Sequence, residues 1–306
     1  MLVIKKRGLV FISLVCLCLF AGCKGKEQER NEKIEDNNAI VLRYAESEPQ
    51  DSVYAQISDY FAALVKEKSH GTINIKVYYD GYLGKEEEVL TQLQFGGIAM
   101  GRVSLLSLTD EVPSLQVDFE SLITCNFPNA LEYIKNNKKK VQFSLQGEKM
   151  SYLTILPPSM RCIYSDNSFE FDDLNTYKLG IDSGSIYEKY LTEKGYNPVI
   201  VGNADTYLSL RNGFIDLRES SLASLVSSNE YPYINQVVLL EGLSIPSFIV
   251  LSNEVMNQLS QEENALITSC AEDTMAFALR LLYPSDSSSI DTITRDHKMR
   301  VFNAEN

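Results

Sequence analysis

Arg102 is a charged residue in a segment that should be buried. It lies between Gly101 and Val103, in an apolar run at 98–103 that predicts a strand inside a core. A buried guanidinium needs an acidic or polar partner. Glu46, at the end of the first predicted strand, is one candidate, and an oxygen atom of a bound ligand is the other. We therefore expect Arg102 and Glu46 either to pair with each other or to bind a small molecule.

The sequence lacks a recognisable catalytic constellation. Its only histidines are His70 and His297, no G-x-S-x-G run occurs, and no spacing favours a Ser–His or Cys–His pair. Paired carboxylates carry no information in a chain with 41 acidic residues. No metal-ligand spacing occurs either. We expect a protein that is not an enzyme and that needs neither a metal nor a cofactor.

Cys23 is the residue whose chemistry is predicted most directly. Three basic residues at 5–7 precede an apolar run of 13 residues, Leu9–Ala21, which is too short to span a bilayer. Small residues then lead into Cys23, which is typical of a bacterial lipoprotein signal in which the thiol accepts lipid. An ordinary secretory signal is the alternative. We expect residues 1–22 to be removed and Cys23 to anchor the chain to the cell membrane, on its extracytoplasmic side.

The charge of the remaining chain restricts its partners. The segment 1–22 holds three basic and no acidic residues, so the rest carries 25 basic against 41 acidic residues, a formal charge of −16. Such a surface repels nucleic acid and anionic lipid. No second run of 18 apolar residues occurs, so no membrane span is expected after the signal. Cys125, Cys162 and Cys270 are expected to be small buried hydrophobic residues, although two of them could pair.

The hydrophobic pattern predicts an α/β fold. Residues 24–38 contain one apolar residue, Ile34, and are expected to form a flexible tether, with structure beginning at Ala39. Strands are predicted at 40–42, 72–78, 98–103, 153–156, 162–164, 177–181, 198–201, 237–240 and 248–251. Helices are predicted from 53 onward and at 86–95, 185–194, 204–212 and 254–282. This alternation implies largely parallel sheets with helices on both faces, and ligands beyond the carboxyl ends of the strands.

Several short segments, in order, are similar to one known family. They are LRYAESEP at 42–49, GYLG at 81–84, EVLTQLQFG at 88–96, VPSL at 112–115, YLSLRNG at 207–213 with Asp216 and Glu219, and NEV through LSQE at 253–262. Together they resemble the solute-binding proteins of TRAP transporters, the DctP-type family. Each segment is weak alone, but their shared order across most of 40–270 is specific.

The resemblance implies a two-lobed fold like that of periplasmic binding proteins, with a ligand cleft between the lobes. We expect lobe I to comprise 39–157 and 243–280, and lobe II to comprise 158–242 and 281–306. The chain should cross between lobes near 157 and 243, and the last long helix should pass back across both. The implied function is capture of a small organic acid, a carboxylate or sugar acid, by a monomer that delivers it to TRAP permease subunits.

The family's first cleft arginine is missing. A strand reading K-I-R-V supplies it in the family, whereas this chain reads Lys178-Leu179-Gly180-Ile181, so Gly180 occupies that position. A buried arginine–carboxylate pair contributes roughly 1.5–3 kcal/mol. Lys178 and Asp182 flank Gly180 on the same strand face, and Lys178 could replace part of the lost charge.

Arg161 aligns with a second cleft arginine of the family and is the expected carboxylate anchor, unless it is a surface charge at a strand start. Glu219, which follows a predicted strand, is expected to line the cleft, and Tyr207 to donate a hydrogen bond to the ligand. Backbone N–H groups at Ser183–Ser185 could hold an anion, although a plain helix cap is the alternative.

Two functions remain open at this stage. In the first, Arg161 and Arg102 supply positive charge to an organic acid and Glu46 and Tyr207 supply hydrogen bonds. In the second, the chain is a non-transport sensor, or a degenerate binding lipoprotein that no longer binds carboxylates, because of Gly180.

Overall fold

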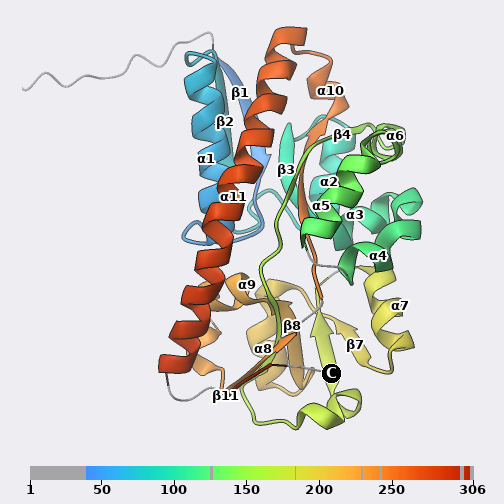
Figure 1. Cartoon of the computed structure of the whole chain (residues 1–306), viewed down its shortest axis with the longest axis vertical. Helices are drawn as coiled ribbons and strands as arrows, with labels where there is room; N and C mark the ends of the chain where they lie inside the picture. The colour runs from blue at the N-terminus through green and yellow to red at the C-terminus, as the bar shows by residue number, and fades with distance from the viewer. Residues whose placement is uncertain are drawn as a thin grey trace, which may run out of the picture. The chain divides into compact units, whose positions relative to one another are not determined.

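The computed structural model describes residues 39–124, 127–182, 184–228, 230–240, 243–296 and 300–303. The signal, Cys23 and the tether lie outside these residues, as do Cys125, Ser183 and His297. The described chain is α/β and contains two mixed sheets (Figure 1). Helices cover both, and the long helix α11 runs past one sheet and then the other (Figure 1).

The first sheet has the strand order β2-β1-β3-β10-β4. Its strands are β1 (Ile40–Ala45), β2 (Ile73–Tyr78), β3 (Met100–Ser104), β4 (Met150–Leu156) and β10 (Ser247–Ser252). Its helices are α1 (Val53–Lys68), α2 (Glu86–Gln94), α3 (Leu105–Glu111), η1 (Pro113–Asp118), α4 (Phe119–Ile123), α5 (Phe127–Asn136), α6 (Lys138–Gly147) and α10 (Asn253–Met256).

The second sheet has the strand order β11-β9-β5-β8-β6-β7. Its strands are β5 (Arg161–Ser165), β6 (Lys178–Ile181), β7 (Asn197–Ile200), β8 (Leu217–Ser221), β9 (Gln236–Leu240) and β11 (Arg300–Asn303). The helices between them are η2 (Phe171–Thr176), α7 (Ser185–Glu193), η3 (Asn203–Asp205), α8 (Thr206–Arg211), α9 (Leu222–Ser227) and η4 (Tyr231–Tyr233).

The chain passes from the first sheet to the second between β4 and β5 and returns between β9 and β10. These connections lie where crossings were predicted from the sequence, while the exact lobe boundaries stay a prediction. The prediction of largely parallel sheets is only partly correct. β10 runs antiparallel to β3 and β4, and β5 runs antiparallel to β8 and β9, because these strands are reached by the crossings.

Local sequence explains how α1 is held against the first sheet. The Ser52 hydroxyl accepts a hydrogen bond from the backbone N–H of Ala55, so Ser52 caps the helix. Val53, Ile57 and Phe61 recur at helical spacing and are buried. This packing fixes the end of β1, from which Glu46 and Glu48 project.

α11 (Gln261–Arg295) is longer than the predicted helix, which ended at 282. It continues through Pro284, although proline removes a helix hydrogen bond and costs about 3 kcal/mol in a helix interior. The buried Asp286 accepts hydrogen bonds from the Ser159 hydroxyl at 2.6 Å and the Met160 N–H at 2.8 Å. The helix is therefore tied to the segment that joins β4 to β5.

Candidate functional site

A cleft of about 620 Å³ lies between the two sheets. The first sheet contributes residues that follow β1, precede α2 and end β3, and the second contributes residues that follow β6 and β7 and end β8. The cleft thus lies at carboxyl ends of strands, where α/β folds bind ligands. Its volume is in the range of small-molecule sites.

Arg102 and Glu46 form a buried pair beneath the cleft wall of the first sheet. Arg102 Nε donates to both Glu46 carboxylate oxygens at 2.9 and 3.0 Å, and Nη2 donates to Oε1 at 2.5 Å. Ser58 Oγ also donates to Glu46, at 2.8 Å. Burial works against the charge of Arg102, but Glu46 outweighs it and raises the pKa of the guanidinium. Arg102 reaches the cleft, whereas Glu46 supports it from behind.

Arg161 and Glu219 form the equivalent pair in the second sheet. They lie diagonally on the neighbouring strands β5 and β8, where Glu219 is in register with Ile163, and Arg161 donates through Nε at 2.6 Å and Nη2 at 2.8 Å to the two Glu219 oxygens. Burial again disfavours the charge, and Glu219 again raises the pKa of Arg161. Arg161 lines the cleft, so it is not a surface charge, whereas Glu219 lies within β8 and supports Arg161.

In each of these arginines, one guanidinium nitrogen, Nη1, does not take part in the pairing with the acid. No described residue accepts a hydrogen bond from Nη1 of Arg102 or of Arg161. The Tyr54 ring also packs on the Arg102 guanidinium, with its centroid 4.3 Å from the guanidinium carbon. Two fixed N–H donors in a cleft can take oxygen atoms of a ligand.

Arg218 is a buried arginine that the sequence reasoning missed. It is fully buried in β8, opposite Gly180 in register, and donates to Asp182, to Asn203 at 2.8 Å and to the Val201 carbonyl at 2.7 Å. Asp182 and Asn203 line the cleft, but Arg218 does not. Its guanidinium therefore orients two cleft residues from beneath. The strand that holds it, β8, was not among the predicted strands, so no expected burial pointed to Arg218.

Gly180 lies within the second sheet and does not line the cleft. A Cβ atom placed on it would lie 2.5 Å from Cδ1 of Ile215, so packing leaves no room for an arginine there without a shift. Lys178 is exposed at the other end of β6 and contacts the Gly213 carbonyl at 3.2 Å. Neither residue supplies the missing charge to the cleft.

Tyr207 is half-buried on α8, beside Tyr233 at a ring-centroid distance of 5.1 Å, and is not among the residues that line the cleft. The Ser183–Ser185 segment was considered as a site for an anion, but an acidic side chain of the protein itself binds at Ser185. The Asp110 carboxylate accepts from the Ser185 N–H at 2.9 Å and hydroxyl at 2.6 Å, so an acid from α3 caps α7. Ser183 itself lies outside the described residues.

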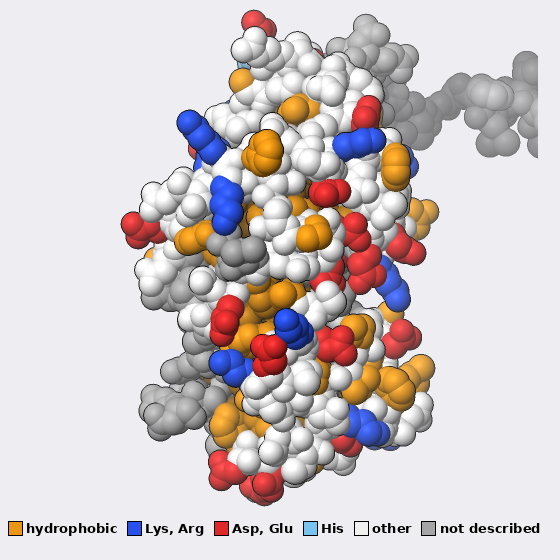
Figure 2. Space-filling model, turned by 90° about the vertical axis from the view of Figure 1, so that its right-hand side faces the viewer, with side chains coloured by type: hydrophobic (Ala, Val, Ile, Leu, Met, Phe, Trp, Pro, Cys, Tyr) orange, Lys and Arg blue, Asp and Glu red, His pale blue; other side chains and the backbone are white. Residues whose placement is uncertain are grey.

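Acidic side chains dominate the cleft wall. The lining bases are Lys85, Arg102 and Arg161, and the lining acids are Glu48, Asp80, Glu86, Glu87, Asp182, Asp205 and Glu230. Figure 2 shows acidic side chains gathered on one face of the molecule near the waist between its upper and lower parts.

Glu48 is the acid most affected by its surroundings. It is buried and accepts a hydrogen bond from Ser224 Oγ at 2.7 Å, which joins β1 of the first sheet to α9 beside the second. Burial raises the pKa of the Glu48 carboxyl to about 7, with Arg102 and Ser224 acting against the rise and Glu46 and Asp182 adding to it. The carboxyl is therefore partly protonated near neutral pH.

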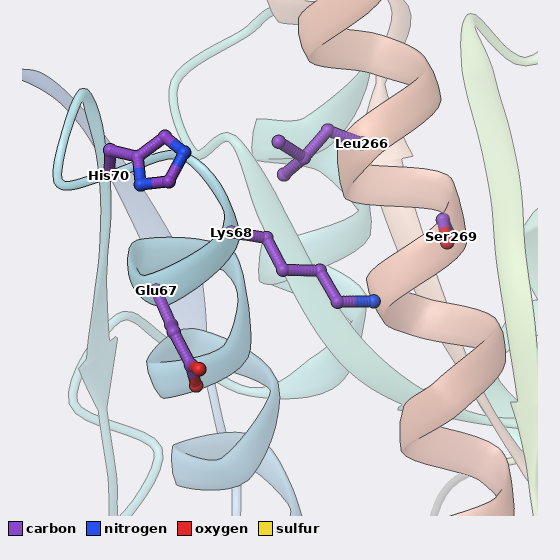
Figure 3. Close-up of a pocket in the computed structure, with 5 residues that line it drawn as sticks. All are labelled: Glu67, Lys68, His70, Leu266 and Ser269. Carbon is purple, nitrogen blue, oxygen red and sulfur yellow. The ribbon is translucent and has the colours of Figure 1, made fainter.

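A second depression, of about 710 Å³, lies between the end of α1 and α11 (Figure 3). Its polar side chains do not converge, because Glu67 and His70 point apart and Lys68 extends toward α11, where it pairs with Asp273 at 2.7 Å (Figure 3). It lacks the buried charged pairs of the cleft.

No group of three or more potential metal ligands occurs among the described residues. Within the same ranges, no helix has the length and apolar character needed to cross a bilayer. Cys162 and Cys270 are buried and unpaired, as expected of small core residues.

Two sheets flanked by helices, with a polar cleft between them, form the architecture of two-lobed solute-binding proteins. The chain belongs to the bacterial extracellular solute-binding protein family 7 (DctP), whose model matches residues 44–306. The resemblance to TRAP solute-binding proteins and the two-lobed fold are thereby confirmed. The expectation of a binding protein rather than an enzyme also agrees with this family.

Individual relatives are distant. A solute-binding protein of Chromohalobacter salexigens is 27% identical over 222 residues, which cover 70% of this chain and 64% of that protein. The chain thus spans less than two thirds of the length of this curated relative.

Solved structures show the same fold. A TRAP periplasmic solute-binding protein from C. salexigens with bound D-glucuronate is 21% identical with a TM-score of 0.77, covering 87% of this chain and 89% of that chain. A Bordetella pertussis extracytoplasmic solute receptor binding pyroglutamic acid is 19% identical with a TM-score of 0.78, covering 88% and 89%.

Proposed function

We propose that this chain is a lipid-anchored, monomeric solute receptor of a TRAP-type transporter, which captures a small organic acid and delivers it to membrane permease subunits. The cleft with its two buried arginines is the observation that carries the proposal. Arg161 and Arg102 line the cleft, Nη1 of each has no acceptor among the described residues, and Glu46 and Glu219 keep the guanidinium groups in place. Such pre-organised donors recognise ligand oxygens without a large ordering cost.

The relatives support the ligand class. The two solved structures described above hold D-glucuronate and pyroglutamic acid, which are both small organic acids. Anchoring rests on the lipoprotein-like signal before Cys23. Tyr207 remains a proposed contact that would require α8 to approach the ligand, since it does not line the cleft.

A second candidate is a binding lipoprotein that no longer takes simple carboxylates. It is favoured by Gly180 and by the acidic groups that already pair with every arginine near the cleft. The two candidates differ in what they bind.

A thermal-shift screen against uronates, aldonates and other small organic acids tests the first proposal. A ligand at 100 times its dissociation constant stabilises the fold by about 2.7 kcal/mol. Arg161→Lys keeps a cation beside Glu219 but removes the planar fork, so we expect affinity to fall roughly 10- to 100-fold. Calorimetric titration with the best acid measures this.

Arg211→Lys is the matched control, because Arg211 is an exposed residue of the second sheet's helices that pairs with Asp166 away from the cleft. We expect it to leave affinity unchanged. No stabilisation by any organic acid, or equal affinities of the two variants, would contradict the proposal.

A further inference from the structure

Every arginine at the cleft is already neutralised by an acid of the chain itself. Glu46 pairs with Arg102, Glu219 with Arg161, and Asp182 with Arg218. What the two lining arginines, Arg102 and Arg161, still offer a ligand is the N–H groups of their Nη1 atoms, not two uncompensated positive charges. Glu48 also lies 3.9 Å from Nη2 of Arg102. The remaining lining base, Lys85, is outnumbered by the lining acids for which the described residues show no ion pair, which are Asp80, Glu86, Glu87, Asp205 and Glu230. A ligand with only negative charge would meet a wall of its own sign.

Glu48 and Asp182 contribute acids from opposite sheets to the same space. Glu48 follows β1 and Asp182 follows β6, both line the cleft, and the charge of Asp182 adds to the rise in the pKa of Glu48. Asp182 also lies close enough to Arg161 to influence its charge. The two carboxylates and the Arg161 guanidinium therefore lie in one small region of the cleft.

One carboxylate oxygen of Asp182 is bound by the protein, and the other can accept a hydrogen bond from a ligand. Arg218 binds its Oδ1 from beneath, and no described residue donates to its other oxygen. Its side chain is 32% exposed, toward the cleft that it lines. Gly180, two residues earlier, brings no cation to offset it. A ligand group next to Asp182 must donate hydrogen bonds and is favoured if it is positively charged.

We propose that the solute is an amino-bearing organic acid, whose ammonium group lies between Glu48 and Asp182 and whose carboxylate takes the Nη1 donors of Arg161 and Arg102. This inference rests on the proposed function and narrows its substrate class. A zwitterion satisfies both halves of the cleft, since it meets the free guanidinium N–H groups and the surplus acids together. A hydrogen bond to a charged group contributes enough to change affinity roughly 10- to 100-fold.

Calorimetric titration of the whole chain with matched pairs of solutes tests the proposal. The pairs are D-gluconate with D-glucosaminate, succinate with L-aspartate, and L-pyroglutamate with L-proline. The two members of each pair share a carbon skeleton, and only one of them carries an ammonium group. We expect the ammonium-bearing member of at least one pair to bind 10-fold or more tightly than its partner.

Asp182→Asn removes the charge and should cut that preference, measured as the ratio of the two dissociation constants within a pair, to less than threefold. Glu48→Gln should reduce the same preference and serves as a second variant if Asp182→Asn does not fold. Asp173→Asn, an exposed change in η2 outside the cleft, is the control that should keep the preference.

The outcomes separate the two proposals. Tight binding of simple acids, with no gain from the ammonium group or no effect of Asp182→Asn, overturns this inference and leaves the proposed function standing. Binding of no member of any pair counts against both.

Discussion

At the scale of single residues, the cleft is built from charges that satisfy one another. Sequence alone could place Arg102 next to Glu46 or next to a ligand. In the structure Nε and Nη2 of Arg102 donate to Glu46, and Nη1 of this cleft-lining side chain has no acceptor among the described residues. Arg218 could not be found in this way. Its strand, LRESS, has a single apolar residue and shows no alternation of apolar and polar residues. The buried charges of Arg218 and Glu219 are compensated by Asp182 and Arg161, which come from elsewhere in the chain.

Glu48 makes stability depend on pH. Its folded pKa of about 7 exceeds the unfolded value of 4.5, so between these values the folded chain retains a proton that the unfolded chain has lost. The free energy of unfolding therefore falls as pH rises through 7, by at most about 3 kcal/mol. Glu48→Gln removes this term, so the variant should match the wild type at pH 4.5 and be more stable at pH 8.

Urea denaturation at pH 4.5, 6 and 8 measures the difference. Glu87→Gln is the control, because Glu87 lines the same cleft but is exposed. A gap between wild type and Glu48→Gln that stays constant with pH would exclude the buried carboxyl as its source.

At the scale of elements, the hydrophobic pattern predicted every strand of the described chain except β8 and β11, but it missed the short helices α3 to α6 and α9. It was insufficient where other interactions hold the backbone. α11 extends past Pro284 through a serine-rich run because Asp286 meets the segment between β4 and β5. β11 has only four residues and pairs with β9 at the sheet edge, so its sequence carries too short a pattern. Long-range contacts of this kind have no local signature.

α7 depends on a cap from another element. Gly184 at its N-cap position has no side chain, and Asp110 of α3 supplies the acceptor for the Ser185 N–H and hydroxyl. Loss of an N-cap acceptor destabilises by about 0.5–2 kcal/mol. We expect Asp110→Ala to lower the free energy of unfolding by that amount and Asp110→Asn by less, since the amide oxygen still accepts.

Chemical denaturation of the variants measures this, with Glu111→Ala as the neighbouring control in the same helix. Because the Asp110–Ser185 contact joins α3 to α7 on either side of the cleft, the affinity for the solute should fall as well. Equal stability losses for Asp110→Ala and Glu111→Ala would show that the cap is not used.

At the scale of the whole molecule, the proposed function requires the cleft to remain close to a permease. A 15-residue tether between Cys23 and Ala39 can span at most about 50 Å, so a lipid on Cys23 would confine the binding unit to the membrane surface. Each buried CH₂ of an acyl chain contributes about 0.8 kcal/mol, and more than one chain is needed for stable anchoring. Without the lipid, a surface of formal charge −16 should leave an anionic membrane.

Cys23→Ser therefore should move the protein from the membrane fraction to the soluble fraction and abolish incorporation of a labelled fatty acid, while solute affinity stays unchanged. Cys18→Ser is the matched control, since Cys18 lies in the same apolar segment but does not follow the small residues 21–22. It should remain lipid-labelled and membrane-bound. If Cys23→Ser instead stays with the membrane and keeps its label, the acyl acceptor is another residue, and the receptor is held near its permease by a different means.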